Sequence, residues 1–147
     1  MSLPRGISLR RARPGDAPGV RALVEQLGYA PDARAFSETF TQVVRHPEAA
    51  VIVLAEGVRV VGYLAISHRP QIRLAGRAAV IDELAVDADH RGRGLGSALL
   101  EHALELARGL GCVRIEVSTR RSRDSYERGF YARHGFVEVD SAMLRQP

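Results

Sequence analysis

The amino-acid sequence predicts a mixed α/β fold, with a mainly antiparallel central sheet of six to seven strands flanked by about four helices. Three observations lead to this prediction. Short β-branched runs follow one another as hairpins in the middle of the chain. The later strands alternate with helical segments. The length of 147 residues, with 46% hydrophobic and 26% charged residues, is typical of one globular domain, expected over residues 1–147.

The N-terminal third is expected to form one strand and two helices. Residues 7–12 alternate apolar with polar or small side chains, as a half-buried strand does. Apolar residues then recur at helical spacing over residues 20–27, and Gly28 ends this run. A second helix is expected over residues 32–45, before Pro47 stops it. Its inner face would carry Phe36, Phe40, Val43 and Val44.

The middle of the chain is expected to form three strands. Residues 51–55 and 59–67 are rich in β-branched side chains and are separated by a Glu-Gly turn, which is typical of a hairpin. Residues 68–77 are polar and contain arginine, so we expect a connecting loop there. Residues 78–86 form the next long strand pattern.

Helices and strands alternate in the predicted C-terminal third. The strongest helical pattern covers residues 94–110, with Gly111 beyond its end. Residues 113–117 predict a strand, residues 124–134 a short helix, and residues 135–139 the start of a closing strand. The apolar stripe of the long helix would comprise Leu99, Leu100, Ala103, Leu106 and Leu110.

Composition excludes several classes of protein and site. All 21 basic residues are arginine, which rules out a catalytic lysine and a Walker-type phosphate loop. No apolar run is long enough to span a bilayer, and the N-terminus does not resemble a secretory signal, so we expect a cytoplasmic protein without a membrane partner. The single cysteine, Cys112, excludes an internal disulfide and is expected to be a buried, inert thiol.

The net charge of +4 is compatible with nucleic acid or with an anionic small molecule, because guanidinium groups suit phosphate contacts. The lack of lysine, the few aromatic residues and the lack of a groove-reading motif argue against a nucleic-acid-binding domain. The five histidines have no metal-ligand spacing, so we expect no metal. Ser97 and Ser118 have no histidine and aspartate arrangement that would indicate a catalytic triad.

The most informative segment is residues 81–97, where a strand leads into a glycine-rich loop and the loop leads directly into the long helix. The first turn of a helix has unpaired N–H groups and the positive end of the helix dipole. Glycines there remove the side chains that would keep a phosphate away from these amides, and arginines add positive charge. We therefore predict an anion site that suits a pyrophosphate. The residues concerned are Arg91, Gly92, Arg93, Gly94 and Gly96.

A dinucleotide site is disfavoured, because position 97 is serine where the Gly-x-Gly-x-x-Gly pattern needs glycine, and because the loop is not in a first β-α unit. The run Arg91-Gly92-Arg93-Gly94-Leu95-Gly96 instead resembles the Arg/Gln-x-x-Gly-x-Gly/Ala signature of the GNAT superfamily of acyl-CoA-dependent N-acyltransferases. Downstream, residues 130–136 resemble the second signature of that family, aromatic-Tyr-x-x-x-Gly-Phe. The resemblance covers about residues 78–136.

The resemblance implies a binding site for acetyl-CoA as co-substrate. Amides of residues 92–97 would surround its pyrophosphate, and the strand before the loop would pair with the pantetheine arm. The N–H of Leu84 would polarise the thioester carbonyl. The implied cofactor-binding residues are Leu84, Ala85, Val86, Arg91, Gly92, Arg93, Gly94, Leu95, Gly96 and Ser97.

The resemblance also implies that Tyr131 protonates the departing CoA thiolate, a reasonable role for a phenol whose pKa is near that of the thiol. The alternative is a core tyrosine flanked by Phe130 and Phe136.

Three carboxylates compete for the role of general base. Glu83 is the first choice because it lies one residue before Leu84, and Asp82 is the second. Strict alternation would send these two side chains to opposite faces, although a bulge could bring both inward. Glu116, on the neighbouring strand, is the third. Each could instead be a solvated or ion-paired carboxylate.

The sequence departs from the family pattern at two positions. Asp124 and Glu127 stand where asparagine and alanine are frequent, which puts in doubt a cofactor contact by Asp124. The preceding loop is rich in arginine, and its side chains would either hold the 3′-phosphate of CoA or form a solvated face. These arginines are Arg120, Arg121 and Arg123.

The function implied is an N-acetyltransferase (EC 2.3.1 type) that moves an acetyl group from acetyl-CoA to a primary amine of a small molecule or peptide, by direct attack in a ternary complex. The alternative is a module that senses acyl-CoA without turnover. Dimers are frequent in the resembled family, so a homodimer is one expectation. The acceptor pocket would lie between residues 28–40 and residues 68–77, which offer Tyr29, Asp32, Glu38 and Arg69.

Overall fold

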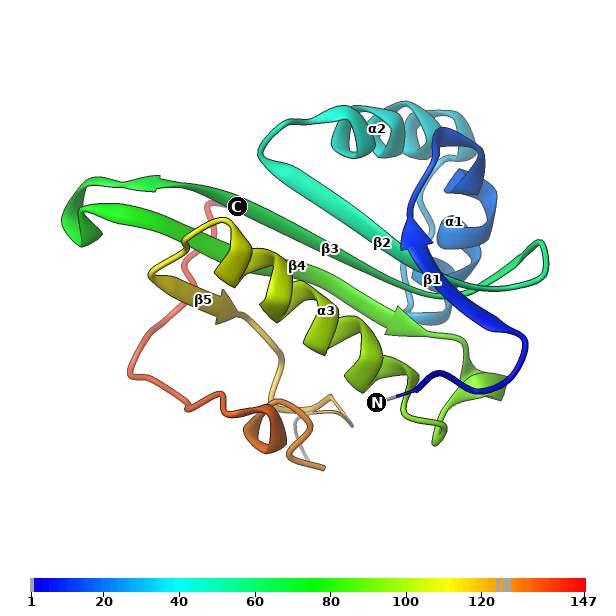
Figure 1. Cartoon of the computed structure of the whole chain (residues 1–147). Helices are drawn as coiled ribbons and strands as arrows, with labels where there is room; N and C mark the ends of the chain where they lie inside the picture. Colours follow the sequence, from blue (N-terminus) through cyan, green and yellow to red (C-terminus); the bar gives the residue numbers. More distant parts are fainter. Residues whose placement is uncertain (1, 124, 126–127) are drawn as a thin grey trace.

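The computed structural model describes residues 2–123, 125 and 128–147. Within these residues, five strands form one sheet in the order β1-β2-β3-β4-β5, accompanied by three α-helices (Figure 1). The pairs β1–β2, β2–β3 and β3–β4 are antiparallel, whereas β5 runs parallel to β4. The strands are β1 (Ile7–Arg11), β2 (Ala49–Glu56), β3 (Arg59–Gln71), β4 (Gly76–Val86) and β5 (Arg114–Val117). The helices are α1 (Ala17–Gln26), α2 (Ala33–Arg45) and α3 (Leu95–Gly109).

The helices cover both faces of the sheet, α1 and α2 on one and α3 on the other (Figure 1). The alternation along β2 explains why: Ile52 and Leu54 pack in the cluster that contains α3, whereas Val51 and Val53 pack in the cluster that contains α1 and α2. Each such side chain contributes about 1.5–3 kcal/mol when fully buried. A continuous apolar run is therefore required here, because β2 has no face in contact with solvent.

The sheet has fewer strands than the six to seven predicted, and three α-helices stand where about four were expected, in the described part of the chain. Residues 135–139, predicted as a closing strand, form none, and Val137 and Val139 are exposed. An alternating pattern forms a strand only when it can pair with the edge of another strand. Residues 135–139 do not pair in this way, and Glu138 forms an ion pair with Arg121 at 2.7 Å. The predicted helix over residues 124–134 falls partly outside the described residues, and its end is a single 3₁₀ turn, η4 (Ala132–His134).

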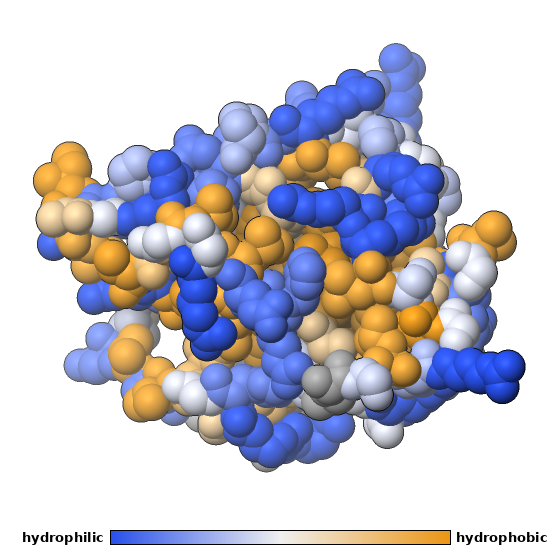
Figure 2. Space-filling model, in the orientation of Figure 1, coloured by the Kyte–Doolittle hydropathy of each residue, from blue (hydrophilic) through white to orange (hydrophobic). Residues whose placement is uncertain are grey.

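The loop predicted over residues 68–77 is instead the end of a long hairpin. β3 continues to Gln71 and β4 begins at Gly76, joined by the 3₁₀ turn η2 (Ile72–Leu74). Polar side chains do not prevent this pairing, because ladder hydrogen bonds use the backbone and this end of the hairpin extends beyond the core. Ile72 is fully exposed at the tip, where Figure 2 shows hydrophobic surface.

The long helix α3 buries the predicted stripe except at its end. Leu99, Leu100 and Ala103 are buried, but Leu110 is 46% exposed. The helix ends at Gly109, and Gly111 turns the chain with φ 72°, so Leu110 lies at the edge of the α3–sheet contact, where it remains half-exposed. Cys112 follows, partly buried against the α3 side of the core, and this burial raises the pKa of its thiol. Among the described residues, no helix has the length and apolar character needed to cross a membrane.

Candidate active site

A cavity of about 710 Å³ opens where β4 and β5 separate. Their pairing ends at Ile81 and Val117, whereas β4 continues beside β3 as far as Val86. Over residues 82–86, one edge of β4 therefore has no strand partner in the described part of the chain. The start of α3 and the segment around Tyr131 form other walls. An extended ligand could pair with this edge as an added strand does.

The cavity brings together almost all of the residues that the sequence proposed for catalysis and cofactor binding. Arg93 is exposed and lies outside the wall, as do Glu116, Arg120 and Arg121. The predicted residues in the wall are Glu83, Leu84, Ala85, Val86, Arg91, Gly92, Gly94, Leu95, Gly96, Ser97 and Tyr131.

Glycine is required at the three loop positions for different structural reasons. Gly92 and Gly94 have φ values of 77° and 76°, in the left-handed region where a side chain would be strained. Gly96 lies in the first turn of α3, where an added Cβ would come within 3.3 Å of the Phe130 ring. The first two glycines thus shape the approach to the helix N-terminus, and the third lets the C-terminal segment pack against it.

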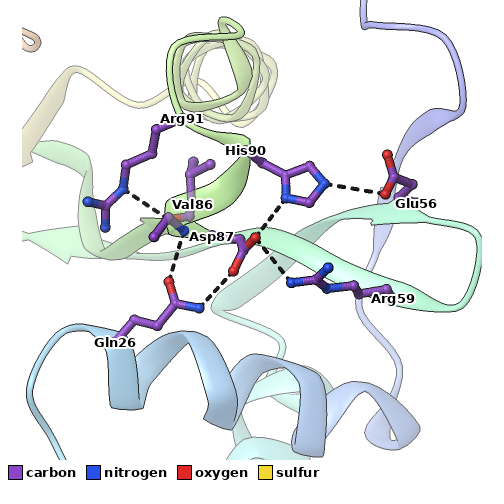
Figure 3. Close-up of polar contacts among 8 residues, drawn as sticks. Gln26, Glu56, Arg59, Val86, Asp87, His90 and Arg91 are labelled. Carbon is purple, nitrogen blue, oxygen red and sulfur yellow. Dashed lines mark hydrogen bonds and ion pairs between the residues drawn. The ribbon is translucent and has the colours of Figure 1, made fainter.

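A polar network around the buried side chains of Asp87 and His90 holds the turn before this loop (Figure 3). Asp87 is 3% exposed and accepts hydrogen bonds from Gln26 Nε2 at 2.7 Å and from His90 Nδ1 at 2.7 Å. Arg59 Nη2 lies 3.2 Å from the same carboxylate, and His90 Nε2 lies 3.3 Å from Glu56. Hydrogen bonds from Gln26 and His90 lower the pKa of Asp87, and the bond to Asp87 raises the pKa of His90. The network ties the loop to α1 and to the β2–β3 hairpin.

The two carboxylates of β4 both line the cavity, because a β-bulge interrupts the alternation. Ala65 pairs with Glu83, whereas the next residue, Ile66, pairs with Ile81. Asp82 is therefore the extra residue, and this is the arrangement that lets neighbouring side chains turn the same way.

The three candidate bases differ in their surroundings. Burial raises the pKa of Asp82, partly opposed by a hydrogen bond with Ser67. Glu83 accepts a hydrogen bond at 2.8 Å from the hydroxyl of Tyr63, a buried residue of β3. Glu116 is exposed on β5 and lies outside the cavity wall.

The surroundings of Tyr131 are compatible with both interpretations that the sequence left open. Its ring packs edge-to-face against Phe130 and Phe136, with centroids 5.0 and 5.8 Å away. It also lines the cavity, and burial raises the pKa of its phenol. The nearby Arg123 opposes this shift. The phenol therefore stays protonated, as a general acid must before it acts.

The structure does not bring together the residues that were predicted to line the acceptor pocket. Tyr29 lines the cavity, but Asp32 caps α2 by accepting from Ala35 N at 3.0 Å, and Glu38 pairs with Arg34. Arg69 lies in the β3–β4 ladder, away from the cavity wall.

Of the three loop arginines, Arg123 lines the cavity, whereas Arg120 and Arg121 do not. Asp124 and Glu127, where the sequence departs from the family pattern, lie outside the described residues.

Sequence reasoning missed several side-chain contacts, most of them between residues that are far apart along the chain. Tyr63 gave no local pattern that pointed to Glu83, and His90 was considered only as a metal ligand. Ser97 was considered only as a member of a catalytic triad, and the contact of its Oγ with His134 Nε2 at 2.9 Å was not foreseen. Within the described ranges, no group of three or more His, Cys, Asp or Glu side chains could hold a metal ion.

Comparisons with known proteins agree with this geometry. Residues 18–136 match the profile of the Acetyltransferase (GNAT) family. Glucosamine 6-phosphate N-acetyltransferase 1 of Oryza sativa subsp. japonica is 32% identical over 132 residues, which are 85% of this chain and 77% of the relative. An aminoalkylphosphonate N-acetyltransferase of Salmonella typhimurium is 33% identical, covering 88% of this chain and 84% of the relative. A solved structure of a putative acetyltransferase from Agrobacterium tumefaciens superimposes with a TM-score of 0.84 at 28% identity, over 95% of this chain and 99% of that one.

Proposed function

The chain belongs to the GNAT acetyltransferase family and is an acyl-CoA-dependent N-acetyltransferase, and from this premise we propose that it acetylates the amine of a small acceptor that also carries an acidic group. The observation that carries the proposal is one cavity that combines the unpaired edge of β4, a glycine loop at a helix N-terminus, a tyrosine and two carboxylates.

The residues present fit acetyl-CoA, which supplies the reactive acetyl thioester. The cavity of about 710 Å³ is of ordinary size for a ligand site. Peptide groups along residues 82–86 suit the amides of a pantetheine arm. The left-handed glycines open the way to the first amides of α3, which suit a pyrophosphate. Arg91 lies at the same end of β4, with Nε 3.4 Å from the carbonyl oxygen of Val86 (Figure 3).

In the proposed reaction, the bond from the acceptor nitrogen to the acetyl carbon forms and the carbon–sulfur bond breaks. Glu83 accepts the proton that the amine loses, directly or through water, and Tyr131 donates its phenolic proton to the leaving sulfur. Each positioned proton transfer is worth about 10²–10⁴-fold in rate. Asp82 remains the second choice as base.

The acidic group of the acceptor is inferred from two observations. The names of two relatives specify glucosamine 6-phosphate and aminoalkylphosphonate, both amines with a phosphorus oxyanion. In this chain, Arg123 lines the cavity close enough to influence both Tyr63 and Tyr131 electrostatically. A guanidinium there suits bidentate contact with a phosphate or phosphonate.

Calorimetric titration with desulfo-CoA, followed by thiol release from acetyl-CoA with paired acceptors, tests the proposal. We expect tight binding of desulfo-CoA and faster release with glucosamine 6-phosphate or an aminoalkylphosphonate than with glucosamine or a simple alkylamine. Tyr131→Phe should lower kcat by about 10²-fold without changing desulfo-CoA affinity.

Arg123→Gln supplies the control for acceptor recognition. It should raise KM about tenfold for the phosphorylated acceptor and leave the phosphate-free acceptor unaffected. Equal effects on both acceptors would contradict the acidic-group assignment. Binding without release from any amine would favour an acyl-CoA sensor, and no binding of desulfo-CoA would overturn the proposed site.

A further inference from the structure

Tyr63 and Glu83 are diagonal neighbours on adjacent strands. In the ladder, Tyr63 lies opposite Ala85 and Glu83 lies opposite Ala65, with one pair between them, so the two side chains stand on the same face of the sheet. Diagonal pairs of this kind are within reach of aromatic and long side chains. The Tyr63 hydroxyl uses this reach to donate a hydrogen bond of 2.8 Å to Oε1 of Glu83.

The two partners differ in burial. Tyr63 is 2% exposed and packs in the cluster formed by α1, α2 and one face of the sheet, so its ring has a fixed position. Glu83 is exposed toward the cavity, where both residues line the wall. A carboxylate on a flexible stem is thus held at one oxygen by a rigid donor.

The donor also keeps its proton over the working pH range. Burial raises the pKa of Tyr63 far above its usual value, and the adjacent Glu83 carboxylate adds to the effect. The hydroxyl therefore remains a donor. Because it occupies Oε1, the other oxygen, Oε2, is left to accept a proton from the acceptor amine or from a bridging water.

We propose that Tyr63 is the positioning residue of this acetyltransferase, which orients the Glu83 carboxylate so that Oε2 faces the acceptor amine. This inference rests on the proposed role of Glu83 as general base. Tyr63 itself exchanges no proton with the substrates.

The test is a double-mutant cycle with Tyr63→Phe, Glu83→Gln and the double variant, measured with the best acceptor. Phenylalanine keeps the ring and its packing and removes only the hydroxyl. Y63F should lower kcat by about tenfold to a hundredfold, because a misplaced catalytic group costs that much, while the affinity for desulfo-CoA stays unchanged. In the E83Q background, Y63F should change kcat less than about twofold.

The outcomes separate failure of the inference from failure of the proposed function. If E83Q keeps full activity, the general base has been assigned wrongly. If E83Q is impaired but Y63F has the same effect in both backgrounds, or none, the positioning role is overturned. A crystal structure of Y63F is a readout independent of turnover: we expect Glu83 to leave its position, and an unmoved carboxylate would contradict the inference.

Discussion

At the scale of single residues, His90 shows how one side chain can hold the start of a glycine-rich loop in place. The glycines that follow it supply the left-handed conformations, but glycine also lowers the cost of leaving them. His90 has carboxylates at both ring nitrogens, Asp87 at 2.7 Å and Glu56 at 3.3 Å. Two such acceptors favour the imidazolium, which has two N–H donors. Charged hydrogen bonds, rather than apolar packing, thereby hold the first residues of the loop.

Stability should depend on the protonation of His90. Its pKa is raised in the folded protein relative to an unfolded value of about 6.5, chiefly by the hydrogen bond to Asp87. The stabilisation is therefore complete below about pH 6.5 and is lost as the pH rises through the folded pKa. We expect the difference in free energy of unfolding between wild type and His90→Gln to shrink from about pH 6 to about pH 9 in urea denaturation. A difference that stays constant would contradict a charged His90.

At the scale of elements, α3 packs against the sheet next to the site, and its first turn forms part of the cavity wall. Leu99 and Leu100 are buried against the sheet, and the same helix begins at the glycine loop. The bulge at Asp82 acts similarly within β4, because one extra residue turns a second carboxylate into the cavity. In both elements, the part that lines the cavity is continuous with a part that is buried.

The two ends of the α3 stripe should respond differently to truncation. Leu99→Ala leaves a cavity under the site and should lower the free energy of unfolding by about 2–5 kcal/mol. Leu110→Ala, at a half-exposed position beyond the helix end, is the matched control and should change it by less than about 0.5 kcal/mol. Urea denaturation of the two variants provides the measurement. Similar losses would mean that Leu110 belongs to the core after all.

At the scale of the whole molecule, the sheet is the framework, and the cavity opens where β4 separates from β5. A ligand that fits this opening binds the folded chain only, so it must stabilise it. Desulfo-CoA at about 100 times its Kd should add about 2.7 kcal/mol and raise Tm by several degrees. Thermal melting with and without the ligand measures the shift. At the same molar concentration, adenosine 3′,5′-bisphosphate, which lacks the pantetheine arm, should give a smaller shift, and equal shifts would argue against pairing along β4.

Local patterns in the sequence predicted what depends on neighbours in the chain. The buried run of β2, the amphipathic α3 and the family of the protein were all correct for this reason. The closing strand was predicted wrongly because strand pairing depends on a distant edge. The β3–β4 extension was missed because its side chains are polar, although the ladder is formed by the backbone. The same holds within the site. Tyr63 and Glu83 are 20 residues apart, and Gln26 and Asp87 are 61 apart, so no spacing rule connects them.

The unpaired edge of β4 over residues 82–86 also has a consequence for aggregation. Unpaired N–H and C=O groups along a strand are a template for joining another chain, and proteins protect such edges from aggregation. Here the exposed stretch is short, recessed in a cavity, and interrupted by the bulge at Asp82. Arg91 and Arg123 stand in the wall and oppose the approach of another basic surface. The same recess and positive charge that suit the proposed slender, anionic ligand thus also disfavour pairing with a second strand of protein.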